Sequence, residues 1–426
     1  MCGMKPVKFL GKWILCKILE FQIKQLRKKH HFKVVAVAGS AGKTSTKFAL
    51  AQMLSTKKKV LFQEGNYNDR LTVPLIFFNH PQPGIFNILA WTRIIFQNFL
   101  IIRRPYEYDC VVVELGTDGP GQIEKFEYLQ PEIVVLTSIA EEHMEYFGSI
   151  DAVAEEEMGV HKFAKLLVVN IDDTNQKYLE GLDFTSYGLS ENAEYRFSKL
   201  VADDLNKPAA ELVLSNGTKI SVKLNMLGNQ GAKICLAAAA VGDMLGYSNE
   251  DISKGLQSIH PVSGRLMVLA GKNGSKVLDD TYNASPIAVK AALDVLYATN
   301  TKHRIAILGS MNELGRDSNE LHKEIGEYCN PSKLDMVVTI GEQAANYLAP
   351  AAKDKGCKVH SFNNPYEAGD FVTEMVKPGS VVLVKGSQNG VFAEEAVKKL
   401  LDHPSDASKL VRQSEYWLAK KAKQFS

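Results

Sequence analysis

A glycine-rich stretch at residues 35–47, VAVAGSAGKTSTK, constrains the fold more than any other part of this sequence. The apolar run that ends near Ala38 is typical of a buried strand, and the residues after Gly42 are typical of a helix. Gly39 and Gly42 allow backbone N–H groups to turn inward, and the N-terminus of a helix attracts anions. A strand, a glycine turn and a helix in this order predict a phosphate-binding loop.

The residues that close this loop suit a nucleotide with Mg²⁺. Lys43 can reach terminal phosphates, and the hydroxyl of Thr44 or Ser45 can ligate the metal. The loop is a shortened GxxGKT, because the first glycine of the full GxxxxGK pattern would fall at Val37. Short matches of this kind also occur by chance, so the interpretation depends on the flanking strand and helix.

Seven short apolar runs predict an α/β fold built on parallel sheets. The runs span residues 32–39, 108–116, 132–139, 165–172, 303–310, 334–341 and 379–387. Each is continuous rather than alternating, which is typical of strands buried on both faces by helices such as 44–55 and 286–298. Residues 193–224 instead alternate apolar and polar residues around a hairpin signal, SNGTK, and predict a small antiparallel section.

Length, charge and cysteine content narrow the class of protein. A chain of 426 residues suggests two or three domains. The formal net charge of +2 shows no global basic excess, so we expect no nucleic-acid partner. The six cysteines lie far apart without a CxxC pair, which argues against a zinc site or a disulfide framework and fits a reducing cytoplasm.

Two apolar segments raise the question of membrane contact. Four lysines interrupt residues 7–31, too many charges for a membrane-spanning helix, and no small-residue cleavage site follows. A basic helix of this composition either lies at a membrane surface or docks on its own domain with its lysines in water. Residues 84–102 are also a poor spanning segment, and form either an amphipathic insertion that touches lipid or a buried helix.

Two polar residues beyond predicted strands are candidates for the same site as the loop. Glu114 ends the run CVVVE, and His143 follows the run EIVVLTSI. Because ligands bind at the carboxyl ends of strands in open α/β sheets, Lys43, Glu114 and His143 can converge on one crevice. The structural alternatives are a solvated strand end for Glu114 and a surface histidine for His143.

Further motifs occur in order along the chain. They are GSAGKTST, EGNYNDRLTVPL, VVVELGTDGPGQI, PEIVVLTSIAEEHMEYFGS, SGR, LDDTYNASP, ILGSMNELG and LVKGS. Together they resemble the Mur ligase family over roughly residues 33–400. They are most like its D-alanyl-D-alanine-adding branch, to which DDTYNASP and GSMNELG are specific.

The resemblance implies an ATP-dependent, Mg²⁺-dependent ligase that forms amide bonds. In this family ATP phosphorylates a carboxylate to an acylphosphate, which an amine then attacks. The implied layout is a basic amphipathic helix at 1–32, a central P-loop ATPase domain with a parallel sheet at 33–260, a C-terminal Rossmann-like domain at 261–412 and a tail at 413–426. The implied partners are peptide or nucleotide-sugar substrates of peptidoglycan synthesis, and we expect a cytoplasmic monomer.

The resemblance also assigns roles to single residues. The ATP-binding set would be Gly39, Ser40, Ala41, Gly42, Lys43, Thr44, Ser45, Arg265 and Asp280. The metal ligands would be Thr44, Glu114 and His143, and the catalytic set would be Lys43, Glu114, His143 and Glu157. The substrate side would be lined by Asn66, Asn68, Tyr282 and Asn283. The structural alternatives are a linker cation for Arg265 and a cap of the helix near Pro286 for Asp279 and Asp280.

Three positions depart from the family pattern. Glu157 stands where many members carry a carbamylated lysine, so we expect its carboxylate to be directed at Mg²⁺ in the same way. The alternative for Glu157 is a solvated acidic helix face that it shares with Glu155 and Glu156. Gln230 and Ile234 replace a histidine and an asparagine of the family's nucleotide segment, which could weaken adenine selection.

The family's domain that grips a UDP-sugar precedes the phosphate loop, where this sequence has only about 32 residues, so we expect that domain to be lacking. The leading function is a ligase that joins an amino acid or a dipeptide such as D-alanyl-D-alanine to a cell-wall precursor. The alternatives are a related ligase with a lipid-linked or other acceptor, and a membrane-associated nucleotide-binding scaffold with weak activity. ADP release that requires both acceptor and amine distinguishes the ligases from the scaffold.

Overall fold

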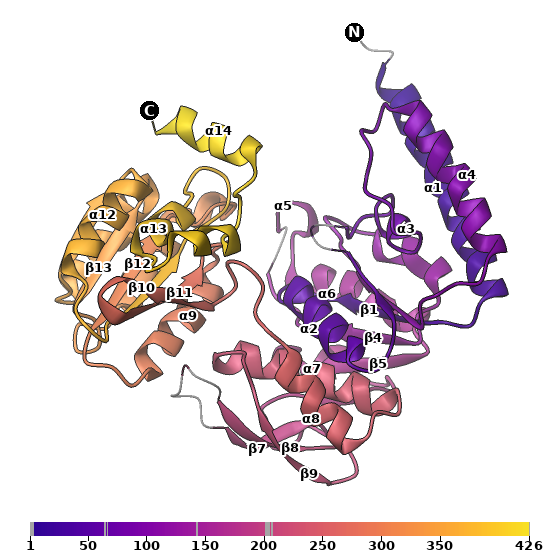
Figure 1. The fold of residues 1–426 in the computed structure, drawn as a ribbon, viewed down its shortest axis with the longest axis horizontal. Helices are drawn as coiled ribbons and strands as arrows, with labels where there is room; N and C mark the ends of the chain where they lie inside the picture. Colours follow the sequence, from indigo (N-terminus) through magenta and orange to yellow (C-terminus); the bar gives the residue numbers. More distant parts are fainter. Residues whose placement is uncertain are drawn as a thin grey trace. The chain divides into compact units, whose positions relative to one another are not determined.

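The computed structural model describes residues 4–63, 65, 67–141, 144–200, 205 and 208–425. These residues form two compact units (Figure 1). The central unit comprises Met1–Lys199, Ala210–Leu224 and Ala232–Ile259, and the C-terminal unit comprises Leu200–Ala209, Asn225–Gly231 and His260–Ser426.

The central unit is built on a six-stranded sheet in the order β2-β3-β1-β4-β5-β6, in which every pairing is parallel. The strands are β1 (Lys33–Ala38), β2 (Val60–Leu61), β3 (Cys110–Glu114), β4 (Ile133–Leu136), β5 (Leu166–Asn170) and β6 (Thr185–Tyr187). Every residue of β3 and β4 is buried, which confirms that continuous apolar runs here mark strands covered on both faces.

Helices and short helical turns surround this sheet. They are α1 (Met4–Lys29), α2 (Lys43–Ser55), α3 (Val73–Ile76), α4 (Ile88–Arg103), η1 (Ile123–Leu129), α5 (Met144–Phe147), α6 (Ile150–Met158), η2 (Gly159–Lys162) and η3 (Gln176–Tyr178). Helix α1 docks on its own unit, because Ile23 and Leu26 join the core formed with β1 and β3. None of the described helices combines the length and apolarity needed to cross a bilayer.

A second, three-stranded sheet in the order β7-β8-β9 follows in the chain and appears in pink below the centre of Figure 1. Its strands are β7 (Arg196–Leu200), β8 (Ala209–Val213) and β9 (Lys219–Lys223). The turn between β8 and β9 is closed by a 2.9 Å hydrogen bond from Leu214 N to the Thr218 carbonyl, as the hairpin signal predicted. Helices α7 (Gly228–Met244) and α8 (Asn249–Ser258) come next, and α8 packs on α2.

The C-terminal unit contains a six-stranded sheet in the order β10-β11-β15-β12-β13-β14. The strands are β10 (Met267–Gly271), β11 (Ser275–Asp280), β12 (Arg304–Gly309), β13 (Met336–Ile340), β14 (Val359–Phe362) and β15 (Val381–Lys385). Only β10 pairs antiparallel, and the remaining pairings are parallel, as in a Rossmann-like sheet with one reversed edge strand.

The two faces of this sheet have separate cores. Alternate residues of β12 illustrate the division, because Ala306 and Leu308 join one core while Ile305 and Ile307 join the other. The helical segments of the unit are η4 (Lys272–Gly274), α9 (Pro286–Ala298), η5 (Gly315–Asp317), α10 (Ser318–Tyr328), η6 (Ala344–Leu348), α11 (Ala349–Asp354), α12 (Pro365–Met375), α13 (Glu394–Leu400), η7 (Pro404–Lys409) and α14 (Glu415–Gln424).

Candidate functional site

The phosphate loop lies between β1 and α2, at the carboxyl edge of the central sheet. Gly39 and Gly42 have φ angles of 116° and 84°, which side-chain-bearing residues rarely adopt. A Cβ atom on Gly39 would lie 2.5 Å from Thr137 Oγ1 and 2.8 Å from the Ser138 carbonyl. Glycine is therefore required at position 39 by both backbone conformation and space.

The segment after β4 holds this loop in place. Ser40 N donates to the Ser138 carbonyl and Ala41 N donates to Ser138 Oγ, each over 2.9 Å. In return, Ala140 N donates to Ser40 Oγ over 3.0 Å. Sequence reasoning missed the role of Thr137 and Ser138, although these hydroxyl residues directly follow a predicted strand.

Glu157 lies directly behind the loop. Its carboxylate is fully buried, accepts a 2.7 Å hydrogen bond from Gly39 N and lies 3.8 Å from Lys43 Nζ. Lys43 Nζ also donates to the carbonyls of Gly39 and Ser40. The alternative of a solvated acidic face is therefore wrong for Glu157, which lies on α6 and contacts the phosphate loop.

The two neighbouring glutamates behave differently. Glu155 is exposed. Glu156 is buried and accepts hydrogen bonds of 2.6–2.7 Å from the backbone amides of residues 121–123, where η1 begins. In the described part of the chain, a hydrogen bond to the phosphate loop is observed for Glu157 and not for the other two acids.

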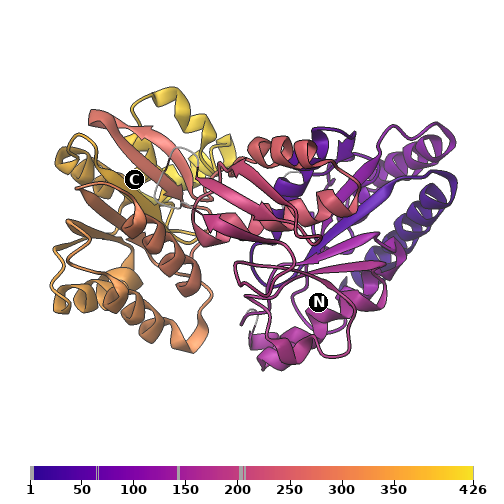
Figure 2. The same ribbon diagram turned by 90° about the horizontal axis from the view of Figure 1, so that it is seen from below.

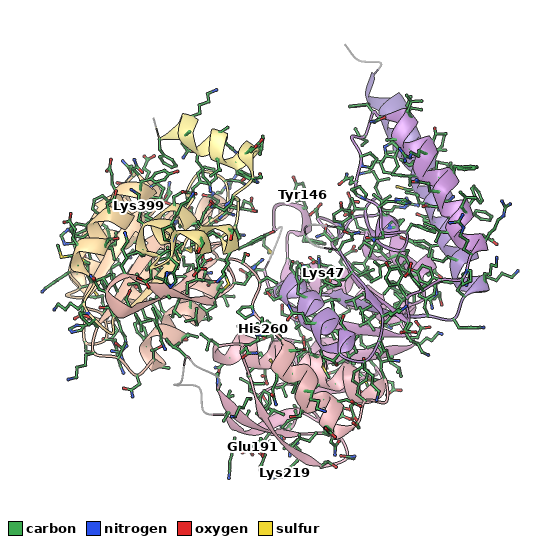
Figure 3. All side chains as sticks on the ribbon, in the orientation of Figure 1. Lys47, Tyr146, Glu191, Lys219, His260 and Lys399 are labelled. Carbon is green, nitrogen blue, oxygen red and sulfur yellow. The ribbon has the colours of Figure 1, made fainter. Side chains whose placement is uncertain are left out.

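Glu114 contacts helix α2 from the end of β3. Thr44 Oγ1 donates to Glu114 Oε1 over 3.2 Å, and Lys47 Nζ lies 3.4 Å from Glu114 Oε2. Glu114 and Lys47 are both buried, so the alternative of a solvated strand end is wrong. Lys47, labelled in Figure 3, was missed from the sequence; the signal was a lysine one helical turn after Lys43, on the same face.

The hydroxyl oxygen of Thr44 and the carboxylate oxygen of Glu114 are metal ligands of the kind that Mg²⁺ prefers. Among the described residues no cluster of three or more histidine, cysteine or acidic side chains offers a complete metal cage. A hydroxyl and one carboxylate still fit this ion, because Mg²⁺ in nucleotide sites is held by one or two protein oxygens together with phosphates and water. His143 lies outside the described residues.

Of the other site residues predicted in the central unit, the structure describes some and not others. Asn66, like His143, lies outside the described residues. Asn68 packs beside the strand that carries Glu114, since a Cβ atom on Gly116 would lie 2.8 Å from Asn68 Cγ. Ser45 occupies the first turn of α2 and is half-buried.

In the C-terminal unit, Asp280 ends β11, Asn283 follows shortly after it, and Lys385 ends β15. Asp280 Oδ2 lies 2.6 Å from Lys385 Nζ, and its Oδ1 accepts from Leu266 N over 3.1 Å. Lys385 Nζ also donates to the Asn283 carbonyl, and Ser387 Oγ donates to Asn283 Oδ1 over 2.8 Å. The carboxyl ends of two adjacent parallel strands are thus joined through polar side chains.

Arg265 stacks on Tyr282, with its guanidinium carbon 4.1 Å from the ring centroid. The two segments are also joined by a 3.0 Å hydrogen bond from Tyr282 N to the Gly264 carbonyl. Arg265 is therefore placed by a specific contact rather than being only a linker cation.

The interpretation of Asp279 and Asp280 as caps of the helix near Pro286 is wrong. The N-cap residue of α9 is Ser285, and its side chain makes no capping hydrogen bond in the described structure. Asp279 is instead fully buried and accepts from Gly264 N over 3.2 Å and from Thr281 Oγ1 over 2.6 Å. Burial raises the pKa of the Asp279 carboxyl to about 6.

Sequence reasoning also missed Arg412, which fixes the loop after β11 from the far end of the chain. Its guanidinium donates to the carbonyls of Thr281 and Tyr282 over 2.5 and 3.0 Å. It also forms a two-point ion pair with the buried Glu394, at 2.8 and 2.9 Å. No local sequence motif indicates this role, because Arg412 and its partners are far apart in sequence.

Two domain descriptions match the chain. The Mur ligase middle domain matches residues 37–242, and the Mur ligase, glutamate ligase domain matches residues 264–388. The chain belongs to the Mur ligase family. It is therefore an ATP- and Mg²⁺-dependent ligase, as the sequence motifs implied.

Several relatives of the Mur ligase family are similar over most of the chain. The UDP-N-acetylmuramoyl-tripeptide–D-alanyl-D-alanine ligase of Bacillus subtilis is 26% identical over 385 residues, covering 87% of this chain and 76% of the relative. The MurF structure from Acinetobacter baumannii has a TM-score of 0.74 at 24% identity, covering 92% and 81% of the two chains. The MurF structure from Thermotoga maritima, in complex with ADP, has a TM-score of 0.72 at 24% identity, covering 90% and 83%. These structures confirm the predicted fold class.

Proposed function

We propose that this Mur ligase activates a peptide carboxylate with ATP and joins it to D-alanyl-D-alanine, which the name of its curated relatives gives as a substrate. The observation that carries the proposal is the contact between the phosphate loop and a buried carboxylate. Thr44 Oγ1 and Glu114 Oε1 lie 3.2 Å apart at the start of α2. Phosphoryl transfer relies on positioning and charge neutralisation, which this arrangement supplies.

The loop residues act mainly by binding phosphate. Helix α2 begins at Lys43 without a side-chain cap in the described structure, so its first-turn amides and the positive end of its dipole suit an anion. Thr44 and Glu114 would hold Mg²⁺, which neutralises charge on the phosphate oxygens. Lys43 Nζ would exchange the carbonyls of Gly39 and Ser40 for a terminal phosphate oxygen, which is a stronger acceptor.

We assign to Glu157 a role in the same site. It binds the Gly39 amide and lies 3.8 Å from Lys43 Nζ, so its negative charge stands where it can orient the lysine or face Mg²⁺. Replacing Glu157 with Gln keeps a hydrogen-bond acceptor for Gly39 but removes the charge. If the carboxylate is directed at the metal, Glu157→Gln raises the Mg²⁺ concentration needed for half-maximal ATP turnover. An unchanged Mg²⁺ dependence would exclude that role.

We assign the C-terminal residues to the nucleotide and the substrate. Arg265 would contact a nucleotide phosphate and Asp280 the ribose, while Tyr282 and Asn283 would lie beside the substrate. Asp280, Tyr282 and Asn283 lie at or just after the carboxyl end of β11, and Arg265 stacks on Tyr282. This position supports the assignment, because ligands of open α/β sheets bind there. The Asp280–Lys385 ion pair gives Asp280 a structural role as well.

A second candidate acceptor is lipid-linked rather than UDP-linked. Exposed apolar side chains on α1 and α4, such as Trp13 and Leu89, favour it, because they suit work at the inner face of a membrane. The enzyme would act as a monomer in either case. A scaffold with weak activity is disfavoured by the buried Glu114–Lys47 and Glu157–Lys43 pairs, which place charges around a phosphate loop.

The acceptor can be identified directly. The purified full chain is incubated with ATP, Mg²⁺, D-alanyl-D-alanine and either UDP-MurNAc-tripeptide or its lipid-linked counterpart, and the joined product is measured by mass spectrometry. The proposal predicts product from the UDP-linked acceptor and ADP release only when acceptor and amine are both present. Product from the lipid-linked acceptor alone would favour the second candidate, and ADP release without coupling would favour the scaffold.

A further inference from the structure

Helices α1 and α4 lie side by side along one edge of the central unit (Figure 1, Figure 2). Gln22 Nε2 donates to the Ile95 carbonyl over 2.8 Å, and Asn98 Nδ2 donates to Gln22 Oε1 over 2.8 Å. Further along, Lys29 Nζ donates to the Arg103 carbonyl over 3.1 Å. The residue numbers of the contacting pairs increase in the same direction along both helices, so the two helices run parallel.

Both helices bury one face against the same part of the unit. A shared apolar cluster contains residues of α1, of α3 and the turn before it, and of α4: Cys16, Leu19, Leu71, Leu75, Trp91 and Ile94. Since both helices turn toward this cluster, their opposite faces lie together on the outside. We call this outward surface of the pair the α1–α4 surface.

The α1–α4 surface is apolar where a docked helix is normally polar. Its large exposed apolar side chains include Trp13, Phe21, Ile88, Leu89, Phe96 and Phe99. Ile88 and Leu89 are 77% and 84% exposed, and Phe96 is 63% exposed. Exposed apolar groups gathered in this way mark an interaction surface rather than ordinary surface scatter.

The charges on this surface have one sign. Its exposed basic residues are Lys17, Lys24, Lys28, Arg93 and Arg103. Helix α4 contains no acidic residue, and the single acid of α1, Glu20, is buried and pairs with Arg70 at 2.6 Å and with Lys17 at 3.1 Å.

The same sign prevails over the whole N-terminal part of the chain. Residues 1–106 hold eighteen lysines and arginines against three acids, whereas residues 107–426 hold thirty-two against forty-five. The near-neutral net charge of the chain therefore conceals a strongly basic segment that contains both helices.

We propose that the α1–α4 surface docks on an anionic lipid bilayer. Its apolar side chains would enter the boundary between headgroups and acyl chains, and its lysines and arginines would contact lipid phosphates. A second copy of the chain is a poorer occupant, because pairing this surface with itself would bring two basic faces together. The inference goes beyond the ligase reaction and does not depend on it, since the surface contains none of the residues assigned to the phosphate loop.

Vesicle co-sedimentation of the full chain tests the proposal. Vesicles of equal parts phosphatidylglycerol and phosphatidylcholine are compared with phosphatidylcholine alone, at low and high salt. The chain should bind the anionic vesicles more tightly, and salt should weaken the binding because it screens the lysines. Equal or absent binding to both kinds of vesicle would contradict the proposal.

Two variants separate the apolar from the charged contribution. Lys24→Gln/Lys28→Gln should weaken binding to anionic vesicles about 25-fold, from about fivefold per charge. Ile88→Gln/Leu89→Gln/Phe96→Gln should weaken it by at least about tenfold, through lost apolar burial. All substituted positions are exposed, so thermal stability and the ligase rate on soluble substrates should stay unchanged.

Matched controls lie on other helices. Ile287→Gln on α9 replaces another exposed isoleucine, and Lys254→Gln on α8 replaces another exposed lysine. Neither should change vesicle binding more than about twofold. Variants of the α1–α4 surface that bind as well as the wild type would overturn the proposal. A shift from dimer to monomer in the apolar variant, without vesicle binding by the wild type, would assign the surface to self-association instead.

Discussion

At the scale of single residues, the backbone of the phosphate loop is confined from two sides. Ser138 binds the amide of Ala41 on one side, and Glu157 binds the amide of Gly39 on the other. The space next to Gly39 is already filled by Thr137 and Ser138. The loop therefore has little freedom to accept a side chain at its first glycine.

Gly39→Ala should cost about 2–4 kcal/mol of unfolding free energy and weaken ATP binding on the order of tenfold or more. The cost combines a strained φ angle of 116° with the 2.5 Å approach to Thr137 Oγ1. Gly181→Ala is the matched control, because Gly181 also has positive φ but no atom lies within 4 Å of the place that its Cβ would take. Calorimetry of unfolding and of ATP binding should show a loss of about 1 kcal/mol and normal ATP affinity for the control. Equal effects in the two variants would contradict this view of the loop.

The buried Asp279 predicts a pH dependence for the C-terminal unit. Burial raises the folded-state pKa of this acid to about 6, above its usual value, so the folded chain holds a proton that the unfolded chain releases. Its contribution to stability is therefore greatest below about pH 4 and falls by about 3 kcal/mol as the pH rises through about 6. Hydrogen exchange of β11 peptides between pH 4 and 7, corrected for intrinsic rates, should show this loss in the wild type and not in Asp279→Asn. The same pH profile in both proteins would refute the assignment.

At the scale of elements, the last helix of the described chain is tied to the candidate site. Lys421 on α14 is fully buried, 2.8 Å from Glu394 Oε1 and 2.6 Å from Glu395 Oε1. It also donates to the Arg412 carbonyl over 2.7 Å. Because Arg412 holds the carbonyls of Thr281 and Tyr282, α14 supports the loop that follows β11.

Lys421→Met should release α14 and loosen the loop after β11. Removing the ammonium takes one cation from each of two buried carboxylates, leaving Glu394 with Arg412 and Glu395 with Lys398 at 3.5 Å, at a cost of about 3 kcal/mol. Hydrogen–deuterium exchange should rise in residues 415–424 and in residues 279–284. Lys420→Met is the control, since the neighbouring Lys420 is exposed and its replacement should leave exchange unchanged. Exchange that rises equally in both variants would show that the ion cluster does not hold the helix.

The elements also show what the sequence could and could not predict. Continuous apolar runs correctly predicted β1, β3, β4, β5, β12, β13 and β15, because burial on both faces leaves that pattern. The strands β2 and β6 were missed, since two or three residues carry no pattern, and β11 was read only as a motif. Lys43 and Glu114 could be predicted as site residues, because Lys43 closes the glycine-rich loop and Glu114 ends a buried apolar run. Lys47 and Arg412 could not, because they meet their partners only in the folded chain.

At the scale of the whole molecule, the chain divides its proposed work between two α/β units. The central unit supplies the phosphate loop and a carboxylate that suits Mg²⁺, and the C-terminal unit supplies a polar cluster at the ends of β11 and β15. The proposed domain boundaries at residues 33, 261 and 413 remain predictions. The basic α1–α4 surface would add a third role, because it can hold the enzyme at an anionic membrane.

The central claim is that ATP phosphorylates a carboxylate before the amine attacks. It is tested most directly with an acceptor whose carboxylate oxygens are labelled with ¹⁸O, incubated with ATP, Mg²⁺ and D-alanyl-D-alanine. Acylphosphate formation joins one carboxylate oxygen to the transferred phosphorus, and amine attack expels it as phosphate. The account predicts one ¹⁸O atom in each phosphate released by the wild type, and at least about 100-fold less labelled phosphate from Lys43→Ala. Amide product accompanied by unlabelled phosphate, or labelling by Lys43→Ala at the wild-type rate, would contradict it.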